Sequence, residues 1–259
     1  MKGQNYIYKF APVNEFTFKN LILSQLWFGP PSSMNDQLEG IVRVSNTDFS
    51  PSKKAIKNFI QSSSLHEHYF NPLGEIKKRG FVDVYMNEWF RSEPNKYGVC
   101  CFSTKPGESL MWAHYALKHT GVCLVYDLES LATSLKRFNS SFNYININYG
   151  IRPIITLKEK KGIINFTSDI PIISAKDPNW KYEKELRFYE KRNDDGMFEG
   201  YAVTIEKQAL KAIIYGSQIS DDDQDAISLV LRNDPHYNNV KEYNCLIDYD
   251  KGKLFFEID

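Results

Sequence analysis

The sequence predicts a single α+β domain with a mixed, mostly antiparallel sheet and helical insertions. Short apolar runs typical of strands alternate with segments of helical periodicity along the whole chain. The 17 Phe and 16 Tyr residues are abundant enough for a strand-rich core. Pro and Gly are spread evenly without a linker-like cluster, so we expect residues 1–259 to form one domain.

The composition excludes several classes of protein. Apolar residues make up 42% and charged residues 25% of the 259 residues, which excludes global disorder. The formal net charge is zero, so a polyanion would bind only at a local basic patch. The N-terminus lacks an apolar signal core, no stretch approaches about 20 apolar residues, and four cysteines are too few for a disulfide scaffold. We therefore expect a soluble, cytoplasmic protein with free thiols and no membrane partner.

Local patterns place the elements of the first half. Residues 6–10 are rich in Tyr, Ile and Phe and predict a strand. Asn14 or Thr17 is a suitable N-cap for a helix that ends near 24. The apolar side of this helix is expected to carry Phe16, Leu21 and Leu23. Further strands are expected at 26–28, 99–103 and 121–127, and further helices from 50 and over 73–90, 109–116 and 128–138.

The second half is expected to be richer in strands. Asn alternates with Tyr and Ile over 142–149, which is the period of a strand. Strands are also expected at 180–190, 201–205 and 212–215, and a helix over 221–231 begins with acidic residues that suit its dipole. The tail predicts a hairpin of 240–247 and 253–258 around Asp250-Lys251-Gly252. Residues 158–173 fit neither pattern.

The most informative stretch is 180–187, Trp-Lys-Tyr-Glu-Lys-Glu-Leu-Arg. If it forms one strand, Glu183, Glu185 and Arg187 share a face. Two carboxylates about 7 Å apart can divide labour, because one orients a nucleophile while the other binds a sugar hydroxyl and stabilises positive charge. Arg187 would keep one of them ionised. The alternative is a solvated strand face with cross-strand ion pairs.

The helix over 109–116 is a second candidate site. Met111, Trp112 and Tyr115 are expected to pack together on it. His114 and His119 are candidate general bases, because histidine titrates near neutral pH. His119 is equally suited to the end of the helix, before a glycine.

Two shorter signals allow two interpretations each. Asn35 and Asp36 follow a proline-rich loop and either hold a ribose or form an Asx turn. Ser103 and Thr104 end a strand, where their hydroxyls either fix a neighbouring glutamate and line a pocket or form a turn of their own.

No metal site and no common nucleotide-binding signature is predicted. The His-x-His pair at 66 and 68 has no convincing third ligand. Walker-type glycine loops, GxGxxG, GxSxG and HExxH do not occur in the sequence.

Taken in order, these segments are similar to a bacterial family of domains of unknown function that is often found in defence-associated contexts. The similar blocks are Tyr8-Lys9-Phe10, Leu26-Trp27-Phe28-Gly29-Pro30, Met34-Asn35-Asp36 with Glu39, Cys101-Phe102-Ser103, Leu110 to Cys123 and Trp180 to Arg187. They cover about 8–215, and several agree in order. This likeness does not by itself imply an activity.

The order of motifs also resembles, more weakly, ADP-ribosyltransferases of the arginine–serine–glutamate type. Those enzymes carry a basic residue on the first strand, a Ser-Thr strand motif and a Glu-x-Glu on a later strand. Lys9, Ser103-Thr104 and Glu183-Lys184-Glu185 take these places here, with lysine instead of the usual Arg or His. Residues 8–10 and 20–22 faintly resemble toxins of this class that act on nucleic acid. The likeness implies an ADP-ribosyltransferase-like fold.

That resemblance implies that NAD is the substrate and that nicotinamide leaves through an oxocarbenium-like state. Glu185 would bind the nicotinamide ribose and stabilise the cation, and Glu183 would orient or deprotonate the acceptor. Lys9 would contact a phosphate, and Trp112 or Tyr115 would stack on nicotinamide. The implied protein is a toxin or anti-phage effector that modifies nucleic acid or protein, with an antitoxin as a further candidate partner.

Two other functions remain open at this point. A non-catalytic module would bind a nucleotide or a protein partner through the regions around 35 and 112. A metal-dependent nuclease would use the carboxylates of Asp36, Glu39, Glu183 and Glu185. Convergence of Lys9, Ser103 and Glu185 on one cleft would favour the transferase.

Overall fold

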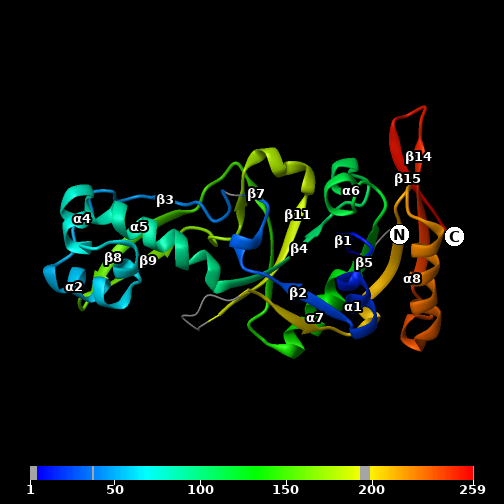
Figure 1. The fold of residues 1–259 in the computed structure, drawn as a ribbon, viewed down its shortest axis with the longest axis horizontal. Helices are drawn as coiled ribbons and strands as arrows, with labels where there is room; N and C mark the ends of the chain where they lie inside the picture. Colours follow the sequence, from blue (N-terminus) through cyan, green and yellow to red (C-terminus); the bar gives the residue numbers. More distant parts are fainter. Residues whose placement is uncertain (1–4, 37, 193–198, 259) are drawn as a thin grey trace.

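An eight-stranded, mostly antiparallel sheet forms the centre of the molecule (Figure 1). The computed structural model describes residues 5–36, 38–192 and 199–258. Across the sheet the strands are β15 (Lys253–Ile258), β14 (Lys241–Asp248), β13 (Leu210–Tyr215), β5 (Val122–Asp127), β1 (Tyr6–Ala11), β4 (Tyr97–Ser103), β11 (Glu185–Lys191) and β6 (Asn143–Asn146). β13 and β14 are parallel, and the other neighbouring pairs are antiparallel. The expected α+β class is confirmed.

Helices cover both faces of this sheet. On one face, α1 (Glu15–Leu23), α7 (Leu128–Phe138) and α8 (Asp221–Asn233) bury Leu21, Leu131 and Ile227 in a common core. On the other face, α6 (Ser109–Tyr115) buries Met111 and Trp112. Burial of each large apolar side chain stabilises the fold by about 1.5–3 kcal/mol. α6 is therefore held firmly above the sheet.

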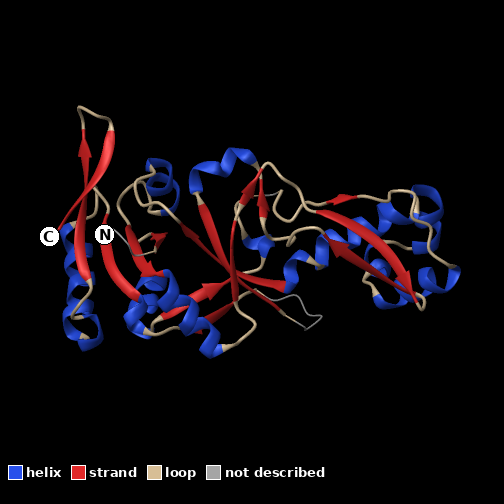
Figure 2. Ribbon diagram, turned by 180° about the vertical axis from the view of Figure 1, so that it is seen from behind, coloured by secondary structure: helices blue, strands red, loops and turns tan. Residues whose placement is uncertain are grey.

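Residues 42–89 and 154–173 form a second core at one end of the elongated molecule (Figures 1 and 2). Its sheet contains β3 (Arg43–Val44), β8 (Ile154–Lys160) and β9 (Ile163–Ser168). Its helices are α2 (Lys53–Ser62), α3 (Leu65–His68), α4 (Pro72–Arg79) and α5 (Phe81–Ser92). Both segments are insertions between strands that belong to the central part of the molecule.

Two small ladders join the central sheet to its surroundings. β2 (Gln25–Phe28) pairs with β12 (Tyr201–Thr204), and β7 (Asn148–Tyr149) pairs with β10 (Ala175–Lys176). A six-residue 3-10 helix, η3 (Pro178–Glu183), follows β10 and leads into β11. Further 3-10 turns are η1 (Pro31–Ser33), η2 (Pro94–Lys96), η4 (Lys207–Ala209) and η5 (Pro235–Tyr237).

β1 and β4 diverge and leave a fork in the central sheet. In the described part of the chain they pair at one position, Tyr8 with Ser103. Away from this pair, β4 instead bridges to the backbone of Gly29, where Val99 and Gly29 exchange two hydrogen bonds of 2.8 and 3.0 Å. The fork therefore opens between β1, β4 and the end of β2.

Several expected elements need correction. Phe16 and Leu23 of α1 are 66% and 50% exposed, so Leu21 is the residue that anchors this helix. The helix expected over 73–90 is two helices separated by Gly80, which adopts φ +92°. The strand expected over 142–149 is interrupted between β6 and β7. The ambiguous stretch 158–173 contains most of the β8–β9 hairpin.

The expected strand over 180–190 is the most important correction. It begins at Glu185, because residues 178–183 form η3 and Lys184 adopts a left-handed conformation with φ 48°. A strand period therefore does not relate Glu183 to Glu185. The α1 N-cap, by contrast, is confirmed, since Asn14 accepts hydrogen bonds from the amides of Phe16 and Thr17.

All four cysteines are free thiols. Burial raises the pKa of Cys123, and burial and Glu185 raise the pKa of Cys101. Within the described ranges, no helix is long and apolar enough to cross a bilayer.

Candidate active site

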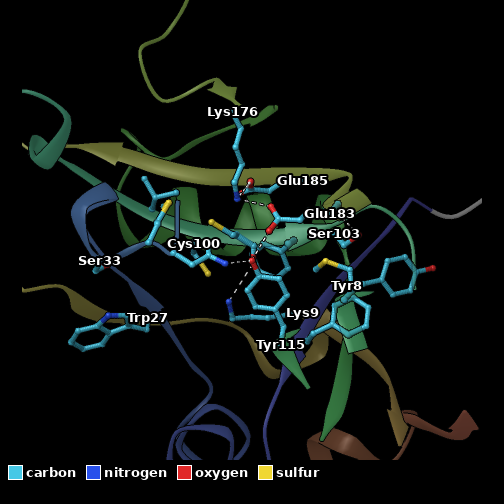
Figure 3. Close-up of a pocket in the computed structure, with 18 residues that line it drawn as sticks. Tyr8, Lys9, Trp27, Ser33, Cys100, Ser103, Tyr115, Lys176, Glu183 and Glu185 are labelled. Carbon is cyan, nitrogen blue, oxygen red and sulfur yellow. Dashed lines mark hydrogen bonds and ion pairs between the residues drawn. The ribbon is translucent and has the colours of Figure 1, made fainter. Parts of the chain in front are cut away.

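A pocket of about 410 Å³ occupies the fork between β1 and β4 (Figure 3). It lies where three neighbouring strands of the sheet, β1, β4 and β11, contribute residues from distant parts of the chain. Six of the residues expected to form a site line it: Lys9, Asn35, Ser103, Tyr115, Glu183 and Glu185. Volumes of this size are typical of small-molecule sites.

The two acids of the Glu-x-Glu motif share one cation. Lys176 Nζ, on β10, lies 2.5 Å from Glu183 Oε2 and 3.2 Å from Glu185 Oε2. The side chains of all three residues are at most 4% exposed. The left-handed Lys184 turns the backbone between the acids, so both carboxylates point toward the same ammonium group (Figure 3).

Arg187 holds Glu185 from the other side. Its Nε and Nη2 donate to Glu185 at 2.6 and 3.0 Å, and its Nη1 and Nη2 donate to Glu39 at 2.6 and 2.9 Å. The remaining Nη1 hydrogen reaches the carbonyl of Ile173 at 2.8 Å. All five guanidinium N–H donors are therefore used, and Arg187 is fully buried. Such an arrangement fixes the Glu185 carboxylate in one orientation.

Tyr115 positions Glu183. Its hydroxyl donates to Glu183 Oε1 at 2.5 Å and accepts from Asn35 Nδ2 at 2.6 Å. Burial and the bond to Glu183 both raise the pKa of Tyr115, so the phenol stays protonated and remains a donor. Tyr115 thus links the loop that carries Asn35 to the acid pair.

The end of α6 fixes the place of Tyr115. The helix is followed by three residues with left-handed backbone, Leu117, Lys118 and His119, with φ of 45°, 55° and 69°. The amide of His119 donates to the carbonyl of Trp112 at 3.2 Å, so His119 closes the helix. Neither His119 nor His114 lines the pocket.

The Ser-Thr motif fixes the acid turn. Ser103 Oγ donates to the carbonyl of Glu183 at 2.7 Å. The Thr104 amide and hydroxyl both donate to the carbonyl of Lys184, at 2.9 and 3.0 Å. These bonds join the end of β4 to residues 80 positions later. The Ser103 hydroxyl therefore braces the backbone of a glutamate, and it also accepts from the amide of Lys105 at 3.1 Å, so both roles expected for it are present. The Thr104 hydroxyl braces Lys184 instead.

The two acids have divergent pKa values. Burial raises the pKa of Glu183. Burial also acts on Glu185, but Arg187 and Lys176 outweigh it and lower the pKa of Glu185 to about 2. Burial disfavours the charged form of Lys176, yet Glu185 and Glu183 raise its pKa above the ordinary value. Two carboxylates whose pKa values are driven apart are suited to different roles, one that holds charge and one that exchanges a proton.

Lys9 and Trp27 also line the pocket. Lys9 Nζ reaches across the fork to the carbonyl of Cys101 at 3.2 Å and lies 5.3 Å from the Phe102 ring centroid. Trp27 is 56% exposed. Figure 3 draws its indole apart from Glu183 and Glu185. The pocket therefore combines an acid pair with a lysine and an exposed aromatic ring.

Three residues expected at the site lie outside this pocket. Trp112 is 0% exposed and donates its indole N–H to the carbonyl of Pro106 at 2.8 Å, so it supports α6 from within the core and has no free face for a ligand. Thr104 points to the Lys184 backbone. Asp36 is buried and accepts from the amide of Leu38 at 2.9 Å, which is an Asx turn.

A metal centre does not fit the carboxylates suggested for a nuclease. Arg187 binds both oxygens of Glu39, and Lys176 and Arg187 bind the carboxylates of the acid pair. A divalent cation would meet two buried positive charges there. No metal-binding cluster of His, Cys, Asp or Glu occurs among the described side chains, and the side chain of His66 lies outside them.

Sequence reasoning missed Lys176 and Trp27. Lys176 lies seven residues before Glu183, and no periodicity links a two-residue strand to a 3-10 turn. Trp27 belongs to a family-like block, but the pattern of β2 reads as an ordinary short strand. Arg187 was recognised as the partner of an acid, and its second partner, Glu39, comes from 148 residues away.

Comparison with known proteins gives one match. Residues 111–188 match the model of a family described as a protein of unknown function (DUF2971). The matched segment runs from α6 to β11 and contains Tyr115, Lys176, Glu183 and Glu185, whereas Lys9 lies outside it. No curated protein and no solved structure matches the chain. The comparisons therefore support a family of unknown function for this segment and assign no activity.

Proposed function

We propose that this protein is an ADP-ribosyltransferase-like enzyme that uses NAD to modify a macromolecule, as a bacterial toxin or anti-phage effector. One observation carries the proposal. Lys9, Ser103 and the pair Glu183 and Glu185 come from separate parts of the sequence and lie around one pocket, on or beside three neighbouring strands. The three motifs of the resemblance thus occupy a common site of suitable size.

The acid pair suits transfer from a glycosidic carbon. As the bond between the ribose C1′ and the nicotinamide nitrogen breaks, its electron pair leaves with nicotinamide and positive charge develops on the ribose. Glu185, whose pKa is about 2, is a fixed anion beside this charge. Glu183 takes the proton of the acceptor as the acceptor lone pair bonds to C1′. Its raised pKa makes it the better proton acceptor of the two.

Neighbouring side chains divide the remaining roles. Tyr115 lines the pocket and, unlike Trp112, is available to a nicotinamide ring. Lys176 and Arg187 hold the carboxylates in place by ion pairs, so they act as positioning residues. Lys9 lines the pocket and is the cation available to a phosphate.

The test is incubation of the full chain with labelled NAD and cellular RNA, DNA and protein. We expect NAD cleavage and label on one class of macromolecule. Absence of both cleavage and transfer would contradict the proposal. Cleavage of nucleic acid that requires a divalent cation but not NAD would favour the nuclease instead.

A matched pair of variants locates the chemistry. Glu185→Gln keeps the shape of the side chain but removes its charge, so we expect at least about a 100-fold loss of NAD cleavage. Glu206→Gln is the control, because Glu206 is a 48% exposed acid paired with Arg137 at the surface. Growth arrest by the wild-type protein that Glu185→Gln relieves and Glu206→Gln does not would support the effector role. Melting curves of both variants show whether the fold is retained.

A further inference from the structure

A second pocket of about 540 Å³ adjoins the acid pocket. We call it the α1 groove. The residues that matter for its chemistry are Lys9, Phe16, Lys19, Asn20, Leu23 and Trp27. Lys9 and Trp27 line both pockets, so the groove begins where the acid pocket ends.

The groove offers apolar faces and positive charge together. Phe16, Leu23 and Trp27 are 66%, 50% and 56% exposed, whereas Leu21 and Phe18 are the α1 side chains that pack in the core of this face. Among the described residues, no Asp or Glu lines the groove, whereas two lysines do. Lys19 pairs with Glu15 at 2.9 Å, but both side chains are more than half exposed, so this pair is weak.

The indole of Trp27 is held as a fixed platform. Gly200 adopts φ +124°, and a Cβ atom at this position would lie 2.5–2.7 Å from three atoms of the indole ring. The backbone of Gly200 therefore lies directly against Trp27, and the ring keeps more than half of its surface in solvent. A pre-positioned, exposed aromatic ring stacks on a flat ligand at a low entropic cost.

We propose that the α1 groove binds single-stranded nucleic acid, which makes single-stranded nucleic acid the acceptor modified in the acid pocket. A base stacks on Trp27, and Lys19, whose ammonium lies 5.3 Å from the Phe16 ring centroid, meets a backbone phosphate. The absence of lining acids suits a polyanion, and an exposed indole suits unpaired bases, whose faces are free to stack. The assignment of the acceptor rests on the proposed transferase function, whereas the binding step does not.

Tryptophan fluorescence tests the binding step without NAD. The full chain is titrated with a single-stranded oligonucleotide of about 12 nucleotides, a length within the site sizes of single-strand binders. Trp89 and Trp112 are 4% and 0% exposed, so quenching reports on Trp27 or Trp180. We expect quenching that Trp180→Phe retains and Trp27→Phe loses. Quenching that survives in Trp27→Phe, or no binding at about 50 mM salt, would overturn the proposal.

Affinity variants separate stacking from charge. Anisotropy of a labelled oligonucleotide is expected to give about 10-fold weaker binding for Trp27→Ala, as for the loss of one stacked base. Lys19→Gln is expected to reduce the salt slope of log K by about 0.7, the value for one phosphate of a single strand. Lys251→Gln is the control, because Lys251 is a 73% exposed lysine of the β14–β15 hairpin. Equal slopes for Lys19→Gln and Lys251→Gln would count against the groove.

Experiments with NAD show whether the α1 groove binds the acceptor or part of NAD. If NAD quenches Trp27 and displaces the oligonucleotide from the groove, the groove holds part of the dinucleotide and the inference is wrong. If Lys19→Gln cleaves NAD at the wild-type rate but transfers less label to single-stranded nucleic acid, the inference is supported. If the wild-type protein binds the oligonucleotide but never cleaves NAD, the binding step stands and the transferase function fails.

Discussion

Replacement of Arg187 by methionine tests how much the fold depends on the charge network beneath the site. Arg187 is 0% exposed, and Glu39 and Glu185 are each 3% exposed at their side chains. Methionine keeps the apolar stem but leaves both carboxylates without their guanidinium. Removal of one partner from a buried ion pair costs about 3–5 kcal/mol. At about 2–4 °C per kcal/mol for a chain of this size, the melting temperature should fall by about 6–20 °C.

The assay is thermal and urea unfolding of Arg187→Met beside Arg137→Met. Arg137 also pairs with a glutamate, but its side chain is 68% exposed, so its loss should cost less than about 1 kcal/mol. Equal melting temperatures for the two variants would refute the reasoning. The double variant Arg187→Met/Glu39→Gln should recover part of the loss, because it removes one of the two uncompensated carboxylates.

The same network predicts an acid-sensitive stability. The pKa of Glu185 falls from 4.5 to about 2 in the folded protein, so the unfolded chain binds this proton more readily. Its contribution is complete above about pH 4.5 and is lost as the pH falls toward 2. Arg187→Met should weaken this dependence, because Lys176 alone would then lower the pKa of Glu185. A wild-type stability that is flat across this window would contradict the assigned partners.

Three further predictions concern single features. Tyr115→Phe removes the donor to Glu183, so the pKa of Glu183 should rise further. The folded state should lose about 1.5–3 kcal/mol, as for a hydrogen bond to a charged group. Unfolding curves measure the loss of stability, and the pH profile of NAD cleavage measures the pKa. Gly216→Ala should destabilise the folded protein by about 3 kcal/mol or more, because its Cβ would lie 2.1 Å from a carbonyl oxygen. Gly107→Ala is the control in the same thermal unfolding experiment and should be neutral, because open space surrounds Gly107. The four cysteines, whose pKa values are raised chiefly by burial, should react slowly with a thiol reagent near pH 8 and fully in urea; rapid labelling of the native protein would contradict this.

Local patterns in the sequence predicted most of the elements but not the geometry of the acid turn. α7 and the tail hairpin follow directly from periodicity, capping and turn residues. The acid turn does not, because alternation in Glu183-Lys184-Glu185 reads as a strand. Only the tertiary bonds from Ser103 and Thr104, which donate to the backbone of Glu183 and Lys184, stabilise the left-handed residue there.

The composition of the site could be predicted in part for a similar reason. The motifs that contain Lys9, Ser103 and the acids occur in a fixed order in the sequence. Such motifs indicate the chemistry of a site but not the distances between its residues. Trp112 and Tyr115 are neighbouring aromatic residues of one helix, yet Trp112 is enclosed in the core whereas Tyr115, three residues later, reaches the pocket. Lys176 was missed because its relation to the acids exists only after η3 has folded back.

The fork in the sheet places the Lys9 side chain where a neighbouring strand would otherwise pair with β4. In a continuous ladder the carbonyl of Cys101 would accept a hydrogen bond from a neighbouring strand, but here it accepts one from the Lys9 ammonium. The Lys9 side chain therefore lies where the acid pocket and the α1 groove meet, since it lines both. One charge-assisted hydrogen bond of about 1.5–3 kcal/mol keeps its ammonium at the carbonyl of Cys101. A ligand that extends from one pocket into the other passes beside this ammonium group.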